Sequence, residues 1–310
     1  MTAKIPLVIL AGSDSRRGPL HEKLSADQVI TGFKGALPLA SGKCLAAELI
    51  DRYRQTGRFE DPVLLGPRAV YRDLVDCEIA DVEGSLAATL QCLHAQAQQR
   101  WSNGQAIAVS ACDILPTSNE IVELLETGYD PNPECQFWWQ MIQSEPNALG
   151  ASSWKPKYLI RKSPDQTPEP MYPGHLVIFR PEAIRMSLWI RIMALTYRYR
   201  NLPIRKRVLP MLVRGLGMLA AQDLRNLTRG QLPILTFSIP WHFLRAFKQH
   251  QKGTLSIPLF EEHISRVLLH RECRTANAVI VTLTKLRSFA QDIDSKQEYE
   301  SVKRLVSSAS

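Results

Sequence analysis

The first half of the chain alternates between continuous apolar runs and segments with helical spacing. Residues 5–11 are apolar throughout and are followed by Gly12 and Ser13, as expected of a strand buried on both faces. Residues 43–56 place apolar side chains at helical spacing and stop at Gly57. The same criteria predict strands over 62–66, 77–82 and 106–111, and helices over 85–101 and 119–126. This alternation predicts an α/β protein with a mostly parallel sheet flanked by helices, which binds its ligand at the carboxyl ends of the strands.

The second half has a different pattern. Strands are predicted over 135–142 and 175–180, separated by the proline-rich connection SPDQTPEPMYPG. A last β-branched strand is predicted over 276–282, before a terminal helix. We therefore expect one domain formed by 1–180 and 271–310, with a basic helical insertion over 181–270 before the last strand. Prolines are expected to break the helices of this insertion at Pro203, Pro210, Pro233, Pro240 and Pro258.

Charge is distributed unevenly along the 310 residues. The net charge is +8, yet residues 1–150 carry 12 Lys and Arg against 19 Asp and Glu. Residues 180–230 carry 11 Lys and Arg against 2 Asp and Glu, which exceeds the excess of the whole chain. An acidic body with one basic segment is unlike a uniformly basic nucleic-acid-binding protein, so no nucleic-acid partner is expected.

Cysteine usage and apolar run lengths narrow the class of protein further. The six cysteines form no CxxC pair and no metal-finger spacing, which favours a reducing compartment. The N-terminal apolar run is too short for a signal peptide, and no apolar stretch reaches the length of about 18 residues that a transmembrane helix needs. We expect a cytoplasmic protein, with peripheral membrane contact as the alternative.

The strongest chemical signal is VILAGSDSRRG, followed by FKGALPLASGK. A buried strand that runs into a Gly/Ser loop presents backbone N–H groups to a polyphosphate. Arg17 and Lys34 supply positive charge that can bind a triphosphate and stabilise a pyrophosphate leaving group. The segment is neither a Walker loop nor a GxGxxG fingerprint, and an ordinary turn with two surface cations explains the composition equally well.

These residues resemble the signature of MobA-like nucleotidyltransferases, a family of NTP transferases with a GT-A type fold. In that family LAGG is followed by Ser-x-Arg, and a Lys then precedes a Leu-Pro-Leu segment. Here Ser13 replaces the second glycine, and Cys44 replaces a common proline. The resemblance implies a GT-A/Rossmann-like sheet and catalytic roles for Arg17 and Lys34. It also implies nucleotide binding by Leu10, Ala11, Gly12, Ser13, Ser15, Arg17 and Lys34.

Three further segments match the family in order. VEGSLAATL resembles the segment that recognises the base, which implies nucleotide binding by Gly84 and Ser85. ACDILP places Asp113 where the family has a metal-binding and catalytic Asp. FAQDIDSKQEYE resembles the closing element DIDTPED, whose second Asp, here Asp294, completes the metal site, with Asp292 as a supporting partner.

Carboxylates at the ends of neighbouring strands offer hard oxygen ligands to Mg²⁺, which is therefore the expected cofactor. The ion would bridge phosphate oxygens during in-line attack on the α-phosphate. The residues taken alone leave another interpretation open, in which Asp113 lies at a helix N-terminus and Asp292 or Asp294 is a helix N-cap.

The residues that would bind the acceptor are harder to identify from the sequence. Lys155, Lys157, Arg161 and Lys162 can pair with an acceptor phosphate or form a solvated basic edge. His175 follows Gly174, where relatives often have Gly-Asn at the acceptor pocket. No HExxH or comparable spacing makes metal ligands of His242, His250, His263 and His270, so we expect ordinary helix residues there.

Residues 183–230 mix arginines with apolar residues such as Trp189 and Met193. A basic amphipathic helix with Trp can lie in an anionic membrane interface. A helical subdomain packed on the sheet, with its arginines toward solvent or toward the acidic first half, is the competing interpretation. A protein or nucleic-acid partner is the third.

The expected function is a Mg²⁺-dependent nucleotidyltransferase that moves NMP from an NTP to a phosphorylated acceptor and releases pyrophosphate. The alternatives are a nucleotide-sugar-dependent glycosyltransferase of the GT-A fold and a non-catalytic nucleotide-binding protein recruited to membranes. The usual DxD of the glycosyltransferases is absent at CDILP. The sequence specifies neither the base nor the acceptor.

Overall fold

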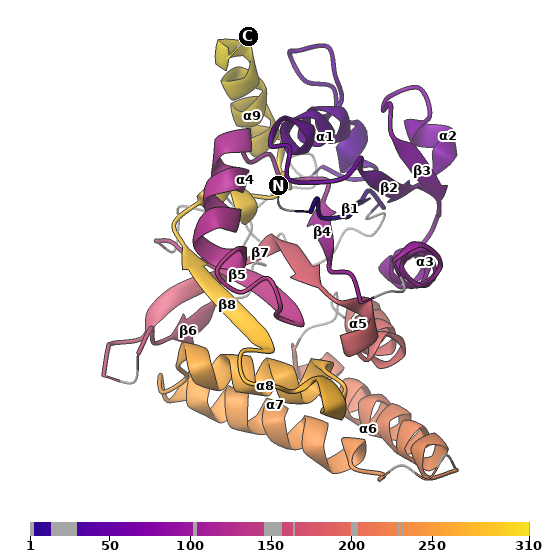
Figure 1. Cartoon of the computed structure of the whole chain (residues 1–310), viewed down its shortest axis with the longest axis vertical. Coiled ribbons are helices and arrows are strands. Elements are labelled where there is room, and N and C mark those ends of the chain that lie inside the picture. Colours follow the sequence, from indigo (N-terminus) through magenta and orange to yellow (C-terminus); the bar gives the residue numbers. More distant parts are fainter. Residues whose placement is uncertain are drawn as a thin grey trace.

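The chain folds around one mixed sheet with helices on both faces, as seen in the computed structural model (Figure 1). The α/β class and the mostly parallel sheet predicted from the sequence are confirmed. The structure describes residues 3–13, 30–101, 104–145, 157–163, 165–199, 204–228, 230 and 232–309.

The sheet of the described residues has the strand order β3-β2-β1-β4-β7-β5-β8, with β6 paired to β7. β3, β2, β1 and β4 run parallel, as do β5 and β8. β7 runs antiparallel to both β4 and β5, so it joins the two parallel groups. The strands are β1 Leu7–Leu10, β2 Val63–Gly66, β3 Glu78–Asp81, β4 Ile107–Ala111, β5 Phe137–Gln143, β6 Tyr158–Ile160, β7 Glu169–Phe179 and β8 Val279–Thr284.

Side-chain caps fix the start of several helices. The hydroxyl of Ser85 accepts from the N–H of Ala88 at the start of α3. Thr117 and Glu120 form a reciprocal capping box at the start of α4. The helices are α1 Leu45–Gln55, α2 Arg68–Tyr71, α3 Leu86–Arg100, α4 Ser118–Leu124, α5 Met186–Tyr199, α6 Ile204–Thr228, α7 Leu235–Gln251, α8 Ile257–Leu268 and α9 Lys296–Ala309.

The two faces of the sheet bury separate apolar clusters. Leu49 of α1 and Ile121 of α4 belong to one cluster. Leu93 of α3, Ile190 of α5 and Leu268 of α8 belong to the other. Because both faces are covered, the central strand β1 is apolar on both sides, which explains the continuous apolar run that contains it.

The second half of the proline-rich connection predicted between two strands is itself part of a strand. β7 begins at Glu169, so Pro170 and Pro173 lie within it, and that expectation was wrong. Proline has no backbone N–H donor, and its presence obscures the alternation of apolar and polar residues that indicates a strand. β7 nevertheless pairs with β5 and with the short strand β6. β6, of only three residues, was not predicted.

Two of the five prolines expected to break helices do not break them. Pro210 lies inside α6 and Pro240 inside α7, so the expectation was wrong at both positions. Each costs its helix about 3 kcal/mol, which packing of both helices into a shared apolar cluster offsets. Pro258 lies in the first turn of α8, and Pro233 precedes α7, as predicted. Pro203 lies outside the described residues.

Four helices, α5 to α8, stand between β7 and β8 in the chain. This matches the helical insertion expected before the last strand; the division into two domains stays a prediction. Figure 1 places α7 at the end of the molecule opposite α9. Among the residues that the structure describes, no helix has the length and apolar character to cross a membrane.

Candidate functional site

Three carboxylates from distant parts of the sequence meet beyond the end of β4. Asp113 follows β4 by two residues, and Asp292 and Asp294 precede α9. One oxygen of each lies within 4.8 Å of the other two. Asp292 and Asp294 are 9% and 7% exposed, so their charges are largely withdrawn from water. Such a cluster demands a cation, because like charges this close repel one another.

Backbone hydrogen bonds bring these segments together. The N–H of Ile293 donates to the carbonyl of Asp113 over 3.0 Å, and the N–H of Ile30 donates to the carbonyl of Asp294 over 2.9 Å. The N–H of Asp294 donates to the Glu298 carboxylate in the first turn of α9. The segment Asp-Ile-Asp is therefore held from both sides.

The helix caps next to this cluster are supplied by other residues. Thr117 caps α4. At α9, the N–H of Ser295 donates to Glu298 over 2.8 Å, and the N–H of Glu298 donates to the Ser295 hydroxyl over 3.2 Å. Asp113 therefore lies before the cap of α4 rather than at the start of that helix, and Ser295 takes the capping position of α9 that the alternative gave to Asp292 or Asp294.

Lys34 supplies the cation. Its ammonium group donates to Asp113 Oδ2 over 3.0 Å and forms a second ion pair with Asp294 Oδ1. Burial by itself would lower the pKa of Lys34, but the charges of Asp113 and Asp294 raise it well above its usual value. The structure therefore brings together three residues that the sequence placed in the site independently.

The position of Lys34 depends on the glycine that follows it. Lys34 begins a short 3-10 turn, and Gly35 within that turn is buried. A Cβ atom at Gly35 would lie 2.9 Å from Tyr71 Oη and 3.1 Å from Cys112 Sγ. Only glycine lets the turn approach the residue next to Asp113 so closely. Burial raises the pKa of the Cys112 thiol to about 12, so this thiol remains protonated and is no nucleophile.

The loop after β1 reaches the first turn of α3. Leu10 ends β1, and the N–H of Ala11 donates to the carbonyl of Leu65 on the neighbouring strand over 2.8 Å. A Cβ atom at Gly12 would lie 3.5 Å from the hydroxyl of Thr89 in α3. Gly12 is exposed and Ser13 half-buried, so both are open to a ligand.

Gly84 and Ser85 stand at the start of α3, on the other side of this approach. Gly84 has a φ of +110°, a conformation that favours glycine. The Ser85 hydroxyl caps the helix by accepting a 3.3 Å hydrogen bond from the N–H of Ala88. The VILAGS motif that follows β1 and the VEGS motif are thus neighbours at the N-terminus of α3. Free N–H groups and the helix dipole favour an anion there. Ser15 and Arg17 lie outside the described residues.

His175 and Gly174 border the carboxylate cluster. His175 Nε2 lies 3.9 Å from Asp292 Oδ1. The Gln140 side chain packs against Gly174, where a Cβ atom would overlap its amide group. Gln140 is wholly buried, and its amide has no hydrogen-bond partner among the residues that the structure describes. Sequence reasoning missed Gln140; a glutamine inside the otherwise apolar FWWQMI run was the available signal.

The other acceptor candidates bond to the chain itself. Lys162 forms an ion pair with Glu169 over 3.2 Å. The Arg161 guanidinium donates to the carbonyl of Gly253. Lys157 is exposed, and Lys155 lies outside the described residues. Neither of these two contacts connects the basic edge to the carboxylate cluster.

Within the described part of the chain, Asp113, Asp292 and Asp294 are the group of side chains with the geometry to hold a metal ion. Carboxylate oxygens are the ligands that Mg²⁺ prefers, so the donor set fits the predicted ion. The histidines of the helical region instead bond to protein groups: His263 to His242 and Gln249, and His250 to the N–H of Leu159.

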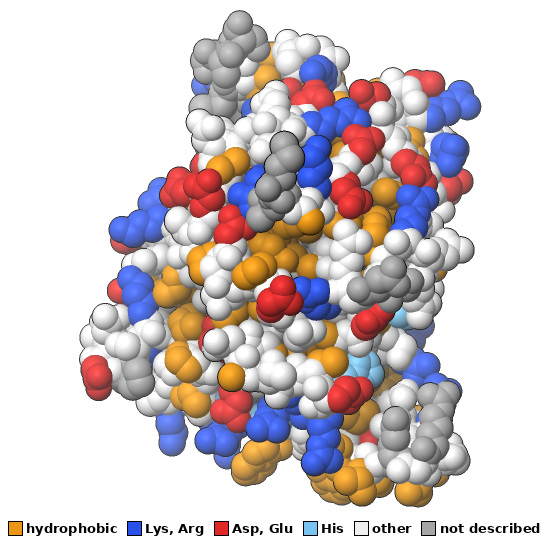
Figure 2. All heavy atoms as spheres, viewed as in Figure 1, with side chains coloured by type: hydrophobic (Ala, Val, Ile, Leu, Met, Phe, Trp, Pro, Cys, Tyr) orange, Lys and Arg blue, Asp and Glu red, His pale blue; other side chains and the backbone are white. Residues whose placement is uncertain are grey.

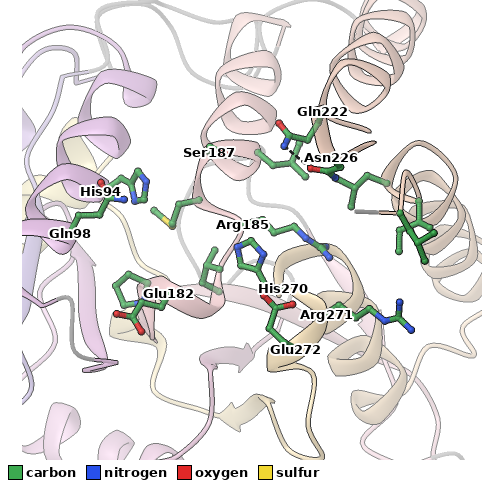
Figure 3. Close-up of a pocket in the computed structure, with 17 residues that line it drawn as sticks. His94, Gln98, Glu182, Arg185, Ser187, Gln222, Asn226, His270, Arg271 and Glu272 are labelled. Carbon is green, nitrogen blue, oxygen red and sulfur yellow. Dashed lines mark hydrogen bonds between the residues drawn. The ribbon is translucent and has the colours of Figure 1, made fainter. Parts of the chain in front are cut away.

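A separate cavity of about 740 Å³ lies between α3 and the helical region (Figure 3). His94 of α3 lines it on one side, and Gln222 of α6 on another. Arg185 and His270 also line it, and burial lowers the pKa of Arg185 to about 10. None of the predicted nucleotide or metal residues lines this cavity.

Comparisons with known proteins show the fold. No protein-family model and no curated protein sequence matches this chain. A hypothetical transferase from Thermus thermophilus superposes with a TM-score of 0.56 at 15% identity, over 95% of this chain and 99% of that chain. This chain therefore has the fold of that transferase.

Other solved structures superpose less closely. CMP:2-keto-3-deoxy-manno-octonic acid synthetase in complex with CTP has a TM-score of 0.49 at 10% identity, over 99% of this chain and 100% of that chain. A 4-diphosphocytidyl-2C-methyl-D-erythritol synthase has a TM-score of 0.38 at 11% identity, over 63% and 80%.

Proposed function

We propose that this protein is a nucleotidyltransferase that transfers NMP from an NTP to a phosphorylated acceptor and releases pyrophosphate. One observation carries the proposal: Lys34, Asp113 and Asp294 converge beyond the end of β4. Each of the three was singled out by a different motif, and those motifs are up to 260 positions apart in the chain.

The carboxylates have the role of holding Mg²⁺. Asp113 and Asp294 would bind the ion, with Asp292 beside them. When bound, Mg²⁺ neutralises charge that develops on phosphate oxygens. Asp292 also faces His175, so the same carboxylate links the metal side of the site to the acceptor side.

Lys34 is the group that meets the triphosphate. Its raised pKa keeps the ammonium protonated at any physiological pH, so it is always available as a cation. Its ion pairs with Asp113 and Asp294 hold this ammonium beside the carboxylates that would bind Mg²⁺, where it would also lie within reach of phosphate oxygens. Stabilisation of the leaving pyrophosphate by such a fixed cation accounts for a large part of catalysis in this class of reaction. Arg17 is proposed to add a second positive charge.

The nucleotide is proposed to lie along the loop after β1 and the start of α3. The N–H groups of Gly12 and Ser13 face its phosphates, and Gly84 with Ser85 approach the base. Support comes from the closeness of Gly12 to Thr89 in the first turn of α3, at the positive end of that helix. Holding both substrates in line is the remaining requirement of the chemistry.

The test is pyrophosphate release. The purified protein is incubated with Mg²⁺, each NTP in turn and a panel of sugar phosphates and alcohol phosphates. Asp113→Asn, Asp294→Asn and Lys34→Gln should each lower the rate about 100-fold or more, as expected for loss of a group that stabilises transition-state charge. Asp73→Asn, at an exposed aspartate that pairs with its neighbour Arg72, is the matched control.

Two outcomes contradict the proposal. Full turnover by Asp113→Asn would remove the carboxylate cluster from the reaction. Tight NTP binding without pyrophosphate release for any acceptor would favour a non-catalytic nucleotide-binding protein.

A further inference from the structure

Large hydrophobic side chains lie in the open on α6, α7 and the segment between them. Phe237 is 80% exposed, Leu209 66% and Trp241 62%. Of the large hydrophobic residues exposed in the described part of the chain, only Leu74 lies elsewhere. Exposed apolar patches of this kind mark sites of protein or membrane interaction. The remaining members are Leu212, Val213, Leu224, Leu227, Leu232, Ile234, Phe243, Leu244 and Phe247.

These residues follow the helical repeat and so form stripes. Phe237, Trp241 and Leu244 are spaced four and three residues apart on α7, and Leu224 and Leu227 are three apart on α6. Leu219 of α6 and Leu235 and Ile239 of α7 are buried in a shared cluster. In Figure 2, hydrophobic side chains protrude along the lower edge of the molecule, where Figure 1 places α7, with Lys and Arg beside them. We call this exposed apolar side of α6 and α7 the apolar edge.

The charged residues of α6, α7 and the segment between them are almost all basic. Residues 204–252 contain nine Lys and Arg and a single acidic residue, Asp223. Asp223 is 5% exposed, and its carboxylate accepts from the N–H groups of Leu235 and Thr236 at the start of α7. The Asp223 carboxylate is therefore buried between α6 and α7 and adds no negative charge to the exposed surface. The exposed basic residues among those described are Lys206, Arg214, Arg225, Arg245, Lys248 and Lys252.

We propose that the apolar edge docks this protein on a membrane surface that contains anionic lipid. The bilayer interface supplies both properties that the edge requires, a place for Trp and Phe rings and negative charge beside them. Attraction between these Lys and Arg side chains and the anionic lipid adds to the burial of the rings and holds the protein there reversibly. Two copies of the edge facing one another would instead set cations against cations. No described helix can cross the membrane, so the helices lie on it.

The structure moves this surface relative to the sequence-based expectation. One of the three interpretations of the sequence placed membrane contact over residues 183–230, with Trp189 and Met193 of α5 among them. Both residues instead pack against the buried cluster on the sheet, as in the competing interpretation. α7, which lies outside that range, supplies the exposed aromatic residues. The docking surface is therefore the helix pair α6–α7 rather than α5.

Vesicle flotation tests the proposal with the full-length protein. The probes are vesicles of phosphatidylcholine alone and vesicles of phosphatidylcholine with phosphatidylglycerol. At low salt the protein should float with the anionic vesicles at least about tenfold more than with the neutral ones, and high salt should release it.

Two variants separate the apolar and the electrostatic parts. Phe237→Ser with Trp241→Ser, and Arg245→Glu with Lys248→Glu, should each reduce flotation at least about tenfold. All four side chains are exposed, so the fold should persist, which circular dichroism and NTP binding can check. Leu74→Ser removes an exposed hydrophobic residue outside the edge and should leave flotation unchanged.

The proposal is overturned by a wild-type protein that stays unbound to anionic vesicles at low salt. It is overturned equally by vesicle binding that Phe237→Ser with Trp241→Ser leaves intact. A dimer in gel filtration that this double variant dissolves, together with no vesicle binding, would make the edge an interface between copies. None of these outcomes depends on whether the protein releases pyrophosphate.

Discussion

Gly35 controls how closely Lys34 can approach the carboxylates. The turn that carries Lys34 packs against Tyr71 and Cys112, with no room for a Cβ atom. The motif FKGALPL contains this glycine, but the resemblance gives no physical reason for it. The structure gives the physical reason, which is contact with the residue that precedes Asp113.

The packing around Gly35 makes a prediction at the scale of single residues. The Tyr71 hydroxyl is buried without a hydrogen-bond partner among the described residues, and burial raises its pKa. Tyr71→Phe should therefore leave the free energy of unfolding unchanged or raise it by about 1 kcal/mol. Gly35→Ala should lower it by about 1–3 kcal/mol through overpacking. In the double variant the loss should be smaller than in Gly35→Ala, because the nearer clash is gone.

Urea denaturation of the wild type, the two single variants and the double variant measures the coupling energy between Gly35 and Tyr71. Gly217→Ala is the matched control, because a Cβ atom there meets nothing within 4 Å in helix α6. It should stabilise the protein slightly. A Gly35→Ala protein as stable and as active as the wild type would show that the turn does not need this close approach.

Helix α7 starts at a carboxylate that comes from another helix. Asp223 of α6 accepts from two backbone N–H groups and from the Thr236 hydroxyl at the start of α7. Because one side of α7 is exposed and apolar, less of its stability comes from burial, and the cap matters more.

The predicted effect is local to the helix pair. Asp223→Ala should lower the free energy of unfolding by about 1–2 kcal/mol, and Asp223→Asn by less. Hydrogen exchange should show lost protection at the start of α7, with NTP binding unchanged. Glu262→Ala, at a half-exposed acid on α8, is the control and should change stability by less than about 0.5 kcal/mol. Equal protection of α7 in Asp223→Ala would contradict the capping role.

Prolines show what element-scale sequence patterns miss. Pro170 and Pro173 lie in β7, and Pro210 and Pro240 lie inside helices. Local propensity gave the opposite expectation in all four cases. The missing hydrogen bonds are offset by strand pairing and helix packing with partners distant in sequence, and local propensity contains no information about those partners.

The ion pairs of Lys34 join the beginning, middle and end of the chain. Lys34 bonds to Asp113 and Asp294, which are 79 and 260 positions away. The raised pKa of Lys34 means that its ion pairs stabilise the whole molecule. This contribution is complete below the unfolded-state pKa of about 10.4 and is lost as pH rises through the higher folded-state pKa.

Unfolding in EDTA across pH 7 to about 11 tests this at the scale of the whole molecule. Lys34→Met should lower the free energy of unfolding by about 3 kcal/mol near neutral pH, because it leaves partly buried carboxylates without their cation. The gap to the wild type should stay constant to about pH 10 and then narrow. Lys43→Met, which breaks an exposed pair with Asp51, should cost less than about 1 kcal/mol. A gap that widens above pH 10 would contradict the assigned sign.

The sequence by itself determined the sheet type and the order of the strands and longer helices in the first half, and it singled out Lys34, Asp113 and Asp294 as candidate site residues. Continuous apolar runs, helical spacing and fixed motif spacing are local properties, so they can be recognised in the sequence alone. Tertiary structure alone decided that those three residues meet, that Gln140 lies against Gly174, and that α5 is covered while the apolar edge of α6 and α7 is not. The physical reason is that burial depends on partners far away in the sequence. The same apolar periodicity describes a helix side packed on a core and one left open to a membrane.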